Sequence, residues 1–292
     1  MKQLCRLLPV FLAVLLSARL AGAGSAVSVL ELHRERSGPF DLAVRGRLSG
    51  VPAGETRWLH RAALAALPAT RLILTGEFVP GEQEVTVVFL DDLWRALPRD
   101  AGADTLLATC KDGYAAVYPE ADFAALRPFL VLEIDGHGPE HWPPPGLKFN
   151  PGPYVVSVSE RLAPAVARLL DPDHKRPWGV DAIEVAAFAE RFRPVFAGAW
   201  ATLSPRAQAG RTIWLNSCAN CHPGPDGMFG GGKSGRPWEV VVAHARWNAD
   251  YFRDYVRKPK GVNACAKMEA HPHYTDAHLA ALIAFLGAET SE

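Results

Sequence analysis

The sequence predicts an α+β protein with two domains, a mixed α/β N-terminal domain followed by an all-α C-terminal domain. The chain has 292 residues, which is enough for two domains of ordinary size. Residues 27–190 contain short β-prone runs separated by Gly and Pro turn signals. Residues 204–287 contain helical patterns with recognisable start signals. We therefore expect the domains to span residues 24–197 and 198–292.

Composition and charge indicate a globular protein and give no sign of nucleic-acid binding. The chain is 49% hydrophobic and 21% charged, as is typical of a globular protein. Its 31 Lys and Arg residues balance its 31 Asp and Glu residues, and it has no long charge run. Binding to nucleic acid is therefore not expected.

Residues 1–23 are typical of a secretory signal peptide. Lys2 and Arg6 supply the positive end, residues 7–16 form a short apolar core, and residues 21–23 form a small-residue cleavage site. The apolar run is too short for an ordinary spanning helix. We expect cleavage before Gly24 to yield a periplasmic protein with no membrane span, and an uncleaved anchor is the alternative.

The first domain is expected to be built mainly from short strands. Asp112-Gly113 between two apolar runs is a strong hairpin signal. Short helices are expected where Ala- and Leu-rich runs end at Pro or Gly. The expected strands are 27–30, 40–44, 71–76, 84–89, 104–109, 114–118, 129–134, 154–159 and 180–188, and the expected helices are 59–67, 90–97 and 164–170.

The second domain is expected to contain helices over residues 206–217, 249–256 and 275–286. Ser204 and Thr275 are suitable N-cap residues for the first and last of these helices. Gly210 and Trp214 share one face of the first helix because they lie four residues apart. A glycine on that face would allow another helix to cross closely.

The sequence Cys218-Ala219-Asn220-Cys221-His222 joins the first of these helices to the rest of the domain. Cys-x-x-Cys-His is the attachment signature of c-type haem. Its two thiols add to the haem vinyl groups, and the following imidazole ligates the iron. A zinc half-site would need a second ligand pair, and a thioredoxin-like redox pair would need a βαβ setting. The sequence supplies neither, so we expect one covalent haem c.

Residues 206–287 resemble a class I cytochrome c domain. The resemblance rests on Gly210 and Trp214, on the haem motif, on the glycine-rich loop 230–235, and on the run 259–268 before the last helix. Class I cytochromes take the sixth iron ligand from a Met on that loop, so the resemblance makes Met268 the axial ligand opposite His222. Both prolines that often flank this Met are missing. Rival ligands are His244, His271 and His273.

Residues 58–190 resemble the molybdopterin-binding domain of sulfite-oxidase-type enzymes. The resemblance rests on the order of the segments 89–94, 105–114, 130–136 and 177–184. The family's molybdenum-binding Cys lies upstream of the Asp-Gly-Tyr hairpin, and this chain has no Cys between Val27 and Thr109. The resemblance therefore implies a retained fold without the catalytic cofactor, and molybdopterin is not expected.

Cys110 and Cys265 are the remaining cysteines of the mature chain, and three roles compete for them. They could be isolated buried thiols. They could form a disulfide between the two domains, which the oxidising compartment would permit. As a third alternative, Cys110 could bind molybdenum.

These observations favour an electron-transfer protein rather than an enzyme. The haem domain would pass single electrons to and from a redox partner protein, and the first domain would dock that partner. One alternative is a molybdenum oxidoreductase with a fused haem acceptor. The other is a ligand-binding redox sensor.

Overall fold

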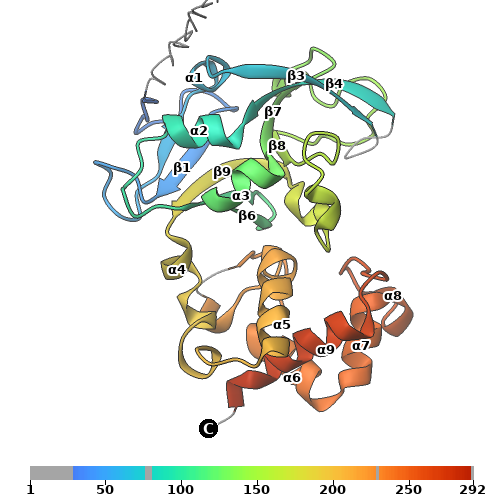
Figure 1. Ribbon diagram of the computed structural model, residues 1–292. Helices are drawn as coiled ribbons and strands as arrows, with labels where there is room; N and C mark the ends of the chain where they lie inside the picture. The colour runs from blue at the N-terminus through green and yellow to red at the C-terminus, as the bar shows by residue number, and fades with distance from the viewer. Residues whose placement is uncertain (1–28, 76–80, 228–229, 291–292) are drawn as a thin grey trace, which may run out of the picture.

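The computed structural model describes residues 29–75, 81–227 and 230–290 and divides them into a sheet-bearing part and a helical part. Figure 1 shows these two parts adjoining, with α4 (Phe188–Arg191) at the junction. The expected signal peptide, residues 1–23, lies outside the described residues. No helix in the described ranges combines the length and the apolar composition needed to cross a membrane.

The sheet-bearing part is organised around one mixed sheet. Most neighbouring strands run antiparallel, while β1 and β9 pair in parallel. The main order is β2-β1-β9-β8-β7-β4-β3, and β5 pairs with both β6 and β9. The strands are β1 (Leu42–Gly46), β2 (Arg57–Leu59), β3 (Ala69–Thr75), β4 (Glu82–Phe89), β5 (Thr105–Cys110), β6 (Ala115–Pro119), β7 (Phe129–Ile134), β8 (Tyr154–Ser157) and β9 (Trp178–Ala186).

The expected hairpin joins β5 to β6. Gly113 has a φ of 85°, which is a left-handed conformation that glycine adopts without strain. Its amide donates to the Cys110 carbonyl at 2.9 Å, and the Asp112 carboxylate accepts from the Tyr114 amide at 3.1 Å. The Asp-Gly pair therefore forms the turn that the sequence predicted.

Three short helices accompany the sheet, namely α1 (Arg61–Ala65), α2 (Leu90–Ala96) and α3 (Glu120–Leu126). The first two confirm the expected helices at 59–67 and 90–97, whereas α3 was not predicted. Trp94 of α2 packs edge-on against Phe123 of α3, with their ring centroids 6.0 Å apart. The helix expected over residues 164–170 is wrong, because only Val166–Arg168 forms a 3-10 turn there.

The helical part contains α5 (Pro205–Asn216), α6 (Trp238–Trp247), α7 (Ala249–Arg257), α8 (Pro259–Val262) and α9 (Asp276–Leu286). The Ser204 side chain caps α5 by accepting from the Ala207 amide at 3.3 Å. The Thr275 side chain caps α9 by accepting from the His278 amide. Both predicted N-caps are therefore confirmed.

Helices α5 and α9 cross at Gly210, as the sequence predicted. A Cβ atom at Gly210 would lie 1.9 Å from the Ala281 carbonyl oxygen and 2.9 Å from the Phe285 Cβ. Trp214 lies one turn further along α5 and is buried against Trp238, with ring centroids 4.8 Å apart. The bare backbone at Gly210 thus allows the close approach, and aromatic side chains fill the space beside it.

Candidate functional site

The haem motif forms one tight turn directly after α5. Cys218–Asn220 is a 3-10 turn, and the Cys218 carbonyl accepts from the amides of Cys221 at 3.1 Å and of His222 at 2.9 Å. These hydrogen bonds hold the two thiols and the imidazole on a single turn of chain. Such an arrangement suits three bonds to one planar group.

The three side chains of the motif are poorly solvated. Burial raises the pKa of the Cys218 thiol to about 12 and that of the Cys221 thiol to about 11. Burial lowers the pKa of His222 to about 4, with a smaller effect from Arg236. The imidazole is therefore neutral near neutral pH, and its buried Nδ1 atom has no hydrogen-bond partner among the described residues. A neutral imidazole and two adjacent thiols fit a covalently attached haem.

The glycine-rich loop after the motif folds back onto it. The Gly231 amide donates to the Ala219 carbonyl at 2.6 Å, and the Ser234 amide donates to the Cys221 carbonyl at 2.9 Å. A Cβ at Gly231 would lie 1.9 Å from the Asn220 carbonyl oxygen. A pocket of about 320 Å³ adjoins this loop and is lined mainly by residues 223–224 and 234–239.

Met268 lies on the loop between α8 and α9, where the sequence predicted the second axial ligand. Its side chain is half-buried and packs against the core of the helical part. Among the rival ligands, His271 and His273 instead contact the Asp171 carboxylate, and His244 packs against Tyr251.

The β5–β6 hairpin of the sheet-bearing part docks onto the haem motif and its loop. The Gly113 carbonyl accepts from the Gly232 amide at 2.6 Å. The Asp112 carboxylate pairs with the Lys233 ammonium at 3.0 Å. The Tyr114 hydroxyl accepts from the Asn220 side-chain amide at 2.9 Å. In the sequence, Asp112, Gly113 and Tyr114 indicated only a turn and a family motif, so their contact with the haem motif and its loop was not predicted.

A second contact between the two parts lies at the other end of the motif. Ser217 directly precedes Cys218, and its hydroxyl donates to Asp171 at 3.0 Å. The Tyr274 hydroxyl donates to the same carboxylate oxygen. Burial raises the pKa of Asp171, but hydrogen bonds from His174, His271 and Tyr274 outweigh it and hold the pKa well below its usual range.

Apolar side chains continue the contact between the two parts. Leu107 of β5, Val117 of β6 and Ala186 of β9 belong to the same buried cluster as Trp214 and Trp238. The two parts therefore share a hydrophobic core beside the motif.

The disulfide between Cys110 and Cys265, one of the three alternatives for these residues, is not present in the structure. Both residues are free thiols in the structure, and they occupy different environments. Cys110 ends β5 and is buried, which raises its pKa to about 12, whereas Cys265 is exposed on the loop before Met268. Cys110 is thus enclosed at the hairpin that packs on the haem motif, whereas Cys265 faces solvent.

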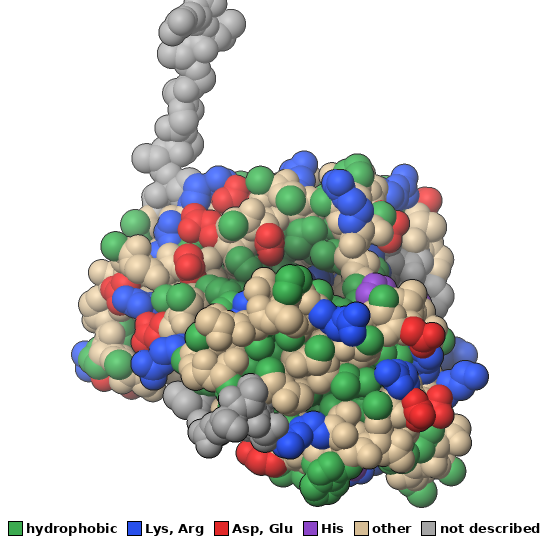
Figure 2. Space-filling view, turned by 60° about the horizontal axis from the view of Figure 1, so that its bottom comes forward, with side chains coloured by type: hydrophobic (Ala, Val, Ile, Leu, Met, Phe, Trp, Pro, Cys, Tyr) green, Lys and Arg blue, Asp and Glu red, His purple; other side chains and the backbone are tan. Residues whose placement is uncertain are grey.

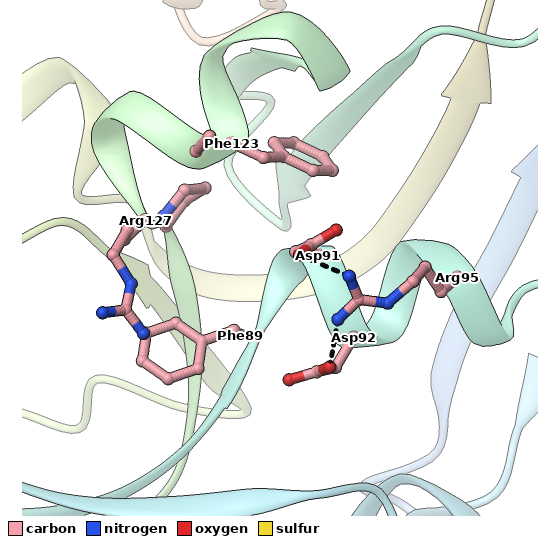
Figure 3. A pocket seen from close by; sticks show the side chains of 8 residues that line it. Phe89, Asp91, Asp92, Arg95, Phe123 and Arg127 are labelled. Carbon is pink, nitrogen blue, oxygen red and sulfur yellow. Dashed lines mark hydrogen bonds and ion pairs between the residues drawn. The ribbon is translucent and has the colours of Figure 1, made fainter. Parts of the chain in front are cut away.

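Several charged groups elsewhere on the molecule form ion pairs. Figure 2 shows positive and negative side chains intermixed over one face. A pocket of about 210 Å³ lies between α2 and α3, and Figure 3 shows Arg95 there, bound to both Asp91 and Asp92. Arg127 lies over the ring of Phe89 at 4.5 Å. These arginines already have partners, so the haem motif is the stronger candidate site.

Comparison with known families supports this assignment for the helical part. Residues 205–286 match the family described as cytochrome C oxidase, cbb3-type, subunit III. No curated protein matches the chain. The helical part is therefore a cytochrome c domain, which implies haem c, a role in electron transfer and a redox partner. The match does not extend to the sheet-bearing part.

Proposed function

We propose that this protein is an exported monohaem cytochrome that transfers one electron at a time, with the sheet-bearing domain serving to dock a partner protein. The single observation that carries the proposal is the Cys218, Cys221 and His222 turn within a cytochrome c domain, held against the β5–β6 hairpin.

In this proposal, Cys218 and Cys221 would hold one haem c covalently, and His222 and Met268 would ligate its iron. The haem supplies a reversible one-electron couple, and a thioether opposite an imidazole raises its potential. His222 offers a neutral ring, because burial lowers its pKa to about 4. If His222 and Met268 both bind the iron, no ligand position would remain for a substrate.

The proposed docking role of the sheet-bearing domain rests on its contacts with the motif. Asp112, Gly113 and Tyr114 bind Lys233, Gly232 and Asn220 respectively. A partner approaching this side of the motif would meet the sheet-bearing domain as well as the cytochrome domain. We interpret that domain, with its sulfite-oxidase-like order of motifs, as a cofactor-free recognition module in the periplasm.

The axial ligands can be tested by absorption spectroscopy of the full mature protein. Wild type is expected to carry one haem by mass and to show the weak near-infrared band of thioether–iron ligation. Met268→Ala should abolish that band and open the iron to carbon monoxide, whereas the control His244→Ala should keep it. A wild type without the band, or a Met268→Ala variant that retains it, would refute the assignment.

The cofactor-free character of the sheet-bearing domain can be tested by elemental analysis of protein purified from its native periplasm. We expect iron without stoichiometric molybdenum. Molybdenum that is present at one atom per chain and lost in Cys110→Ser would make the protein an oxidoreductase instead.

A further inference from the structure

A cluster of histidines surrounds one carboxylate at the seam between the two domains. Asp171 comes from the sheet-bearing domain, just before the 3-10 turn Pro172–Lys175. His271 and His273 come from the cytochrome domain, between Met268 and α9. One ligand atom from each of Asp171, His271 and His273 lies within 4.8 Å of those from the other two.

The two oxygens of Asp171 have separate surroundings. Oδ1 lies 2.7 Å from His273 Nε2 and 3.6 Å from His271 Nδ1. Oδ2 instead accepts hydrogen bonds from the hydroxyls of Ser217 and Tyr274, and His174 Nδ1 lies 3.4 Å from it. Oδ1 thus faces the two imidazole nitrogens of His271 and His273, while the groups around Oδ2 fix the orientation of the carboxylate. Hydrogen bonds of this kind orient the carboxylate ligands of metal sites.

These distances are close to those that a small divalent ion requires. Ligand atoms about 2.1 Å from a tetrahedral zinc ion lie roughly 3.4 Å from one another. The Oδ1 distances of 2.7 and 3.6 Å bracket that separation, and the two imidazole nitrogens lie within 4.8 Å of each other, so side-chain rotations would be needed to bring all three atoms into place. Asp171 and His271 have side chains only 8% and 13% exposed, while His273 is 47% exposed. The half-exposed ring leaves a route for the ion to enter and for water to complete its coordination.

We propose that Asp171 Oδ1, His271 Nδ1 and His273 Nε2 form a binding site for a divalent transition-metal ion such as Zn²⁺. Two imidazoles and one carboxylate are a known ligand set for zinc. The ligands come from both domains, so the bound ion fastens the cytochrome domain to the sheet-bearing domain beside Cys218. This ion is separate from the haem iron, and the site rests on the proposed function in one respect, because it needs a sixth haem ligand other than His271 or His273.

The proposal is tested by titrating Zn²⁺ into the full-length mature holoprotein after chelator treatment, with isothermal calorimetry as the readout. We expect one ion per chain, with an affinity that falls at least tenfold in both Asp171→Asn and His273→Ala. His141→Ala is the matched control, because this ring is 69% exposed and lies outside the cluster. Zn²⁺ should also raise the thermal midpoint of wild type but not that of His273→Ala, because an ion that binds only the folded protein stabilises it.

Haem absorption and circular dichroism identify any variant that fails to fold. If Asp171→Asn is misfolded, His273→Ala decides the question, since its half-exposed ring can be removed with little change in packing. Absence of saturable Zn²⁺ binding in wild type would overturn the proposal. Binding that survives unchanged in folded His273→Ala would overturn it as well.

Discussion

At the crossing of α5 and α9, the close packing and the helix propensity predict opposite changes in stability when Gly210 is replaced by Ala. Alanine is favoured over glycine inside a helix by about 1 kcal/mol. Gly210→Ala would therefore stabilise the cytochrome domain if the position had free space. The new Cβ would instead lie 1.9 Å from the Ala281 carbonyl oxygen and 2.5 Å from the Ala281 carbonyl carbon, where ordinary contacts begin near 3.4 Å. Both of these atoms belong to the backbone of α9, so the clash can be relieved only if the helices move apart.

The expected loss of stability depends on the side-chain packing that this movement would loosen. Trp214, Trp238 and Phe285 pack together beside the crossing, with ring centroids between 4.8 and 6.4 Å apart. Overpacking a core typically costs about 1–3 kcal/mol. Because the obstacle is backbone, we expect Gly210→Ala to cost about 2–3 kcal/mol and Gly210→Val to cost more.

The assay is denaturant unfolding of the holoprotein, followed by the haem absorption band so that the cytochrome domain is observed directly. Gly287→Ala is the matched control, because Gly287 ends α9 with a φ of −78° and a Cβ added there would have nothing within 4 Å. The control should be neutral or slightly stabilising. A Gly210→Ala variant as stable as wild type, or more stable, would refute the close crossing.

Three further predictions concern the domain seam, a buried charge and the free thiols. Gly113→Ala should weaken the contact between the domains and increase cleavage in limited proteolysis, because its Cβ would lie 2.7 Å from the backbone of the haem-motif loop. Gly136→Ala is its control, because Gly136 also has a positive φ but nothing within 4 Å. Burial lowers the pKa of Lys175 from 10.5 to about 8. The buried charge therefore destabilises the folded protein fully below the lowered pKa, and this destabilisation disappears as the pH rises toward 10.5. Between about pH 7 and about pH 10, the unfolding free energy of wild type should therefore rise by about 2–3 kcal/mol relative to that of Lys175→Met, as measured by denaturant unfolding. Thiol titration should find Cys265 reactive in the native protein and Cys110 reactive only after denaturation, and reactivity of neither would indicate the disulfide.

Local signals in the sequence predicted most elements but not how they pair. The Asp112-Gly113 turn, the Ser204 and Thr275 caps and the Gly210 crossing each depend on a few neighbouring residues. The parallel pairing of β1 with β9 joins segments nearly 140 residues apart, and no local pattern specifies it. Residues 164–170 have the composition of a helix, yet Val166 is buried against Leu126 and Val158 in a separate small cluster. Tertiary packing there overrides the local propensity.

The residues of the candidate site also divide into those that a local sequence pattern predicts and those that only the fold brings together. Cys218, Cys221 and His222 were predictable because their chemistry depends on spacing within one turn. The role of Asp171 was not predictable, because its partners His271 and His273 lie about 100 residues away and on the other domain. The sequence left the interdomain disulfide open as one of three alternatives for a related reason. An even number of cysteines says nothing about proximity, and Cys110 lies at the haem motif while Cys265 is exposed on another loop.

The contacts at the seam constrain how a partner could reach the haem motif. The sheet-bearing domain binds Ser217 directly before the motif, Asn220 within it and Lys233 of the following loop. A partner cannot approach that side without displacing the hairpin or contacting it. Displacing the hairpin would break a 3.0 Å ion pair, several hydrogen bonds and a shared apolar core, whereas a partner that contacts the hairpin leaves all of them intact. On the proposed function, recognition on this side therefore falls to the sheet-bearing domain, and the cytochrome domain keeps its electron-transfer role without needing a docking surface of its own there.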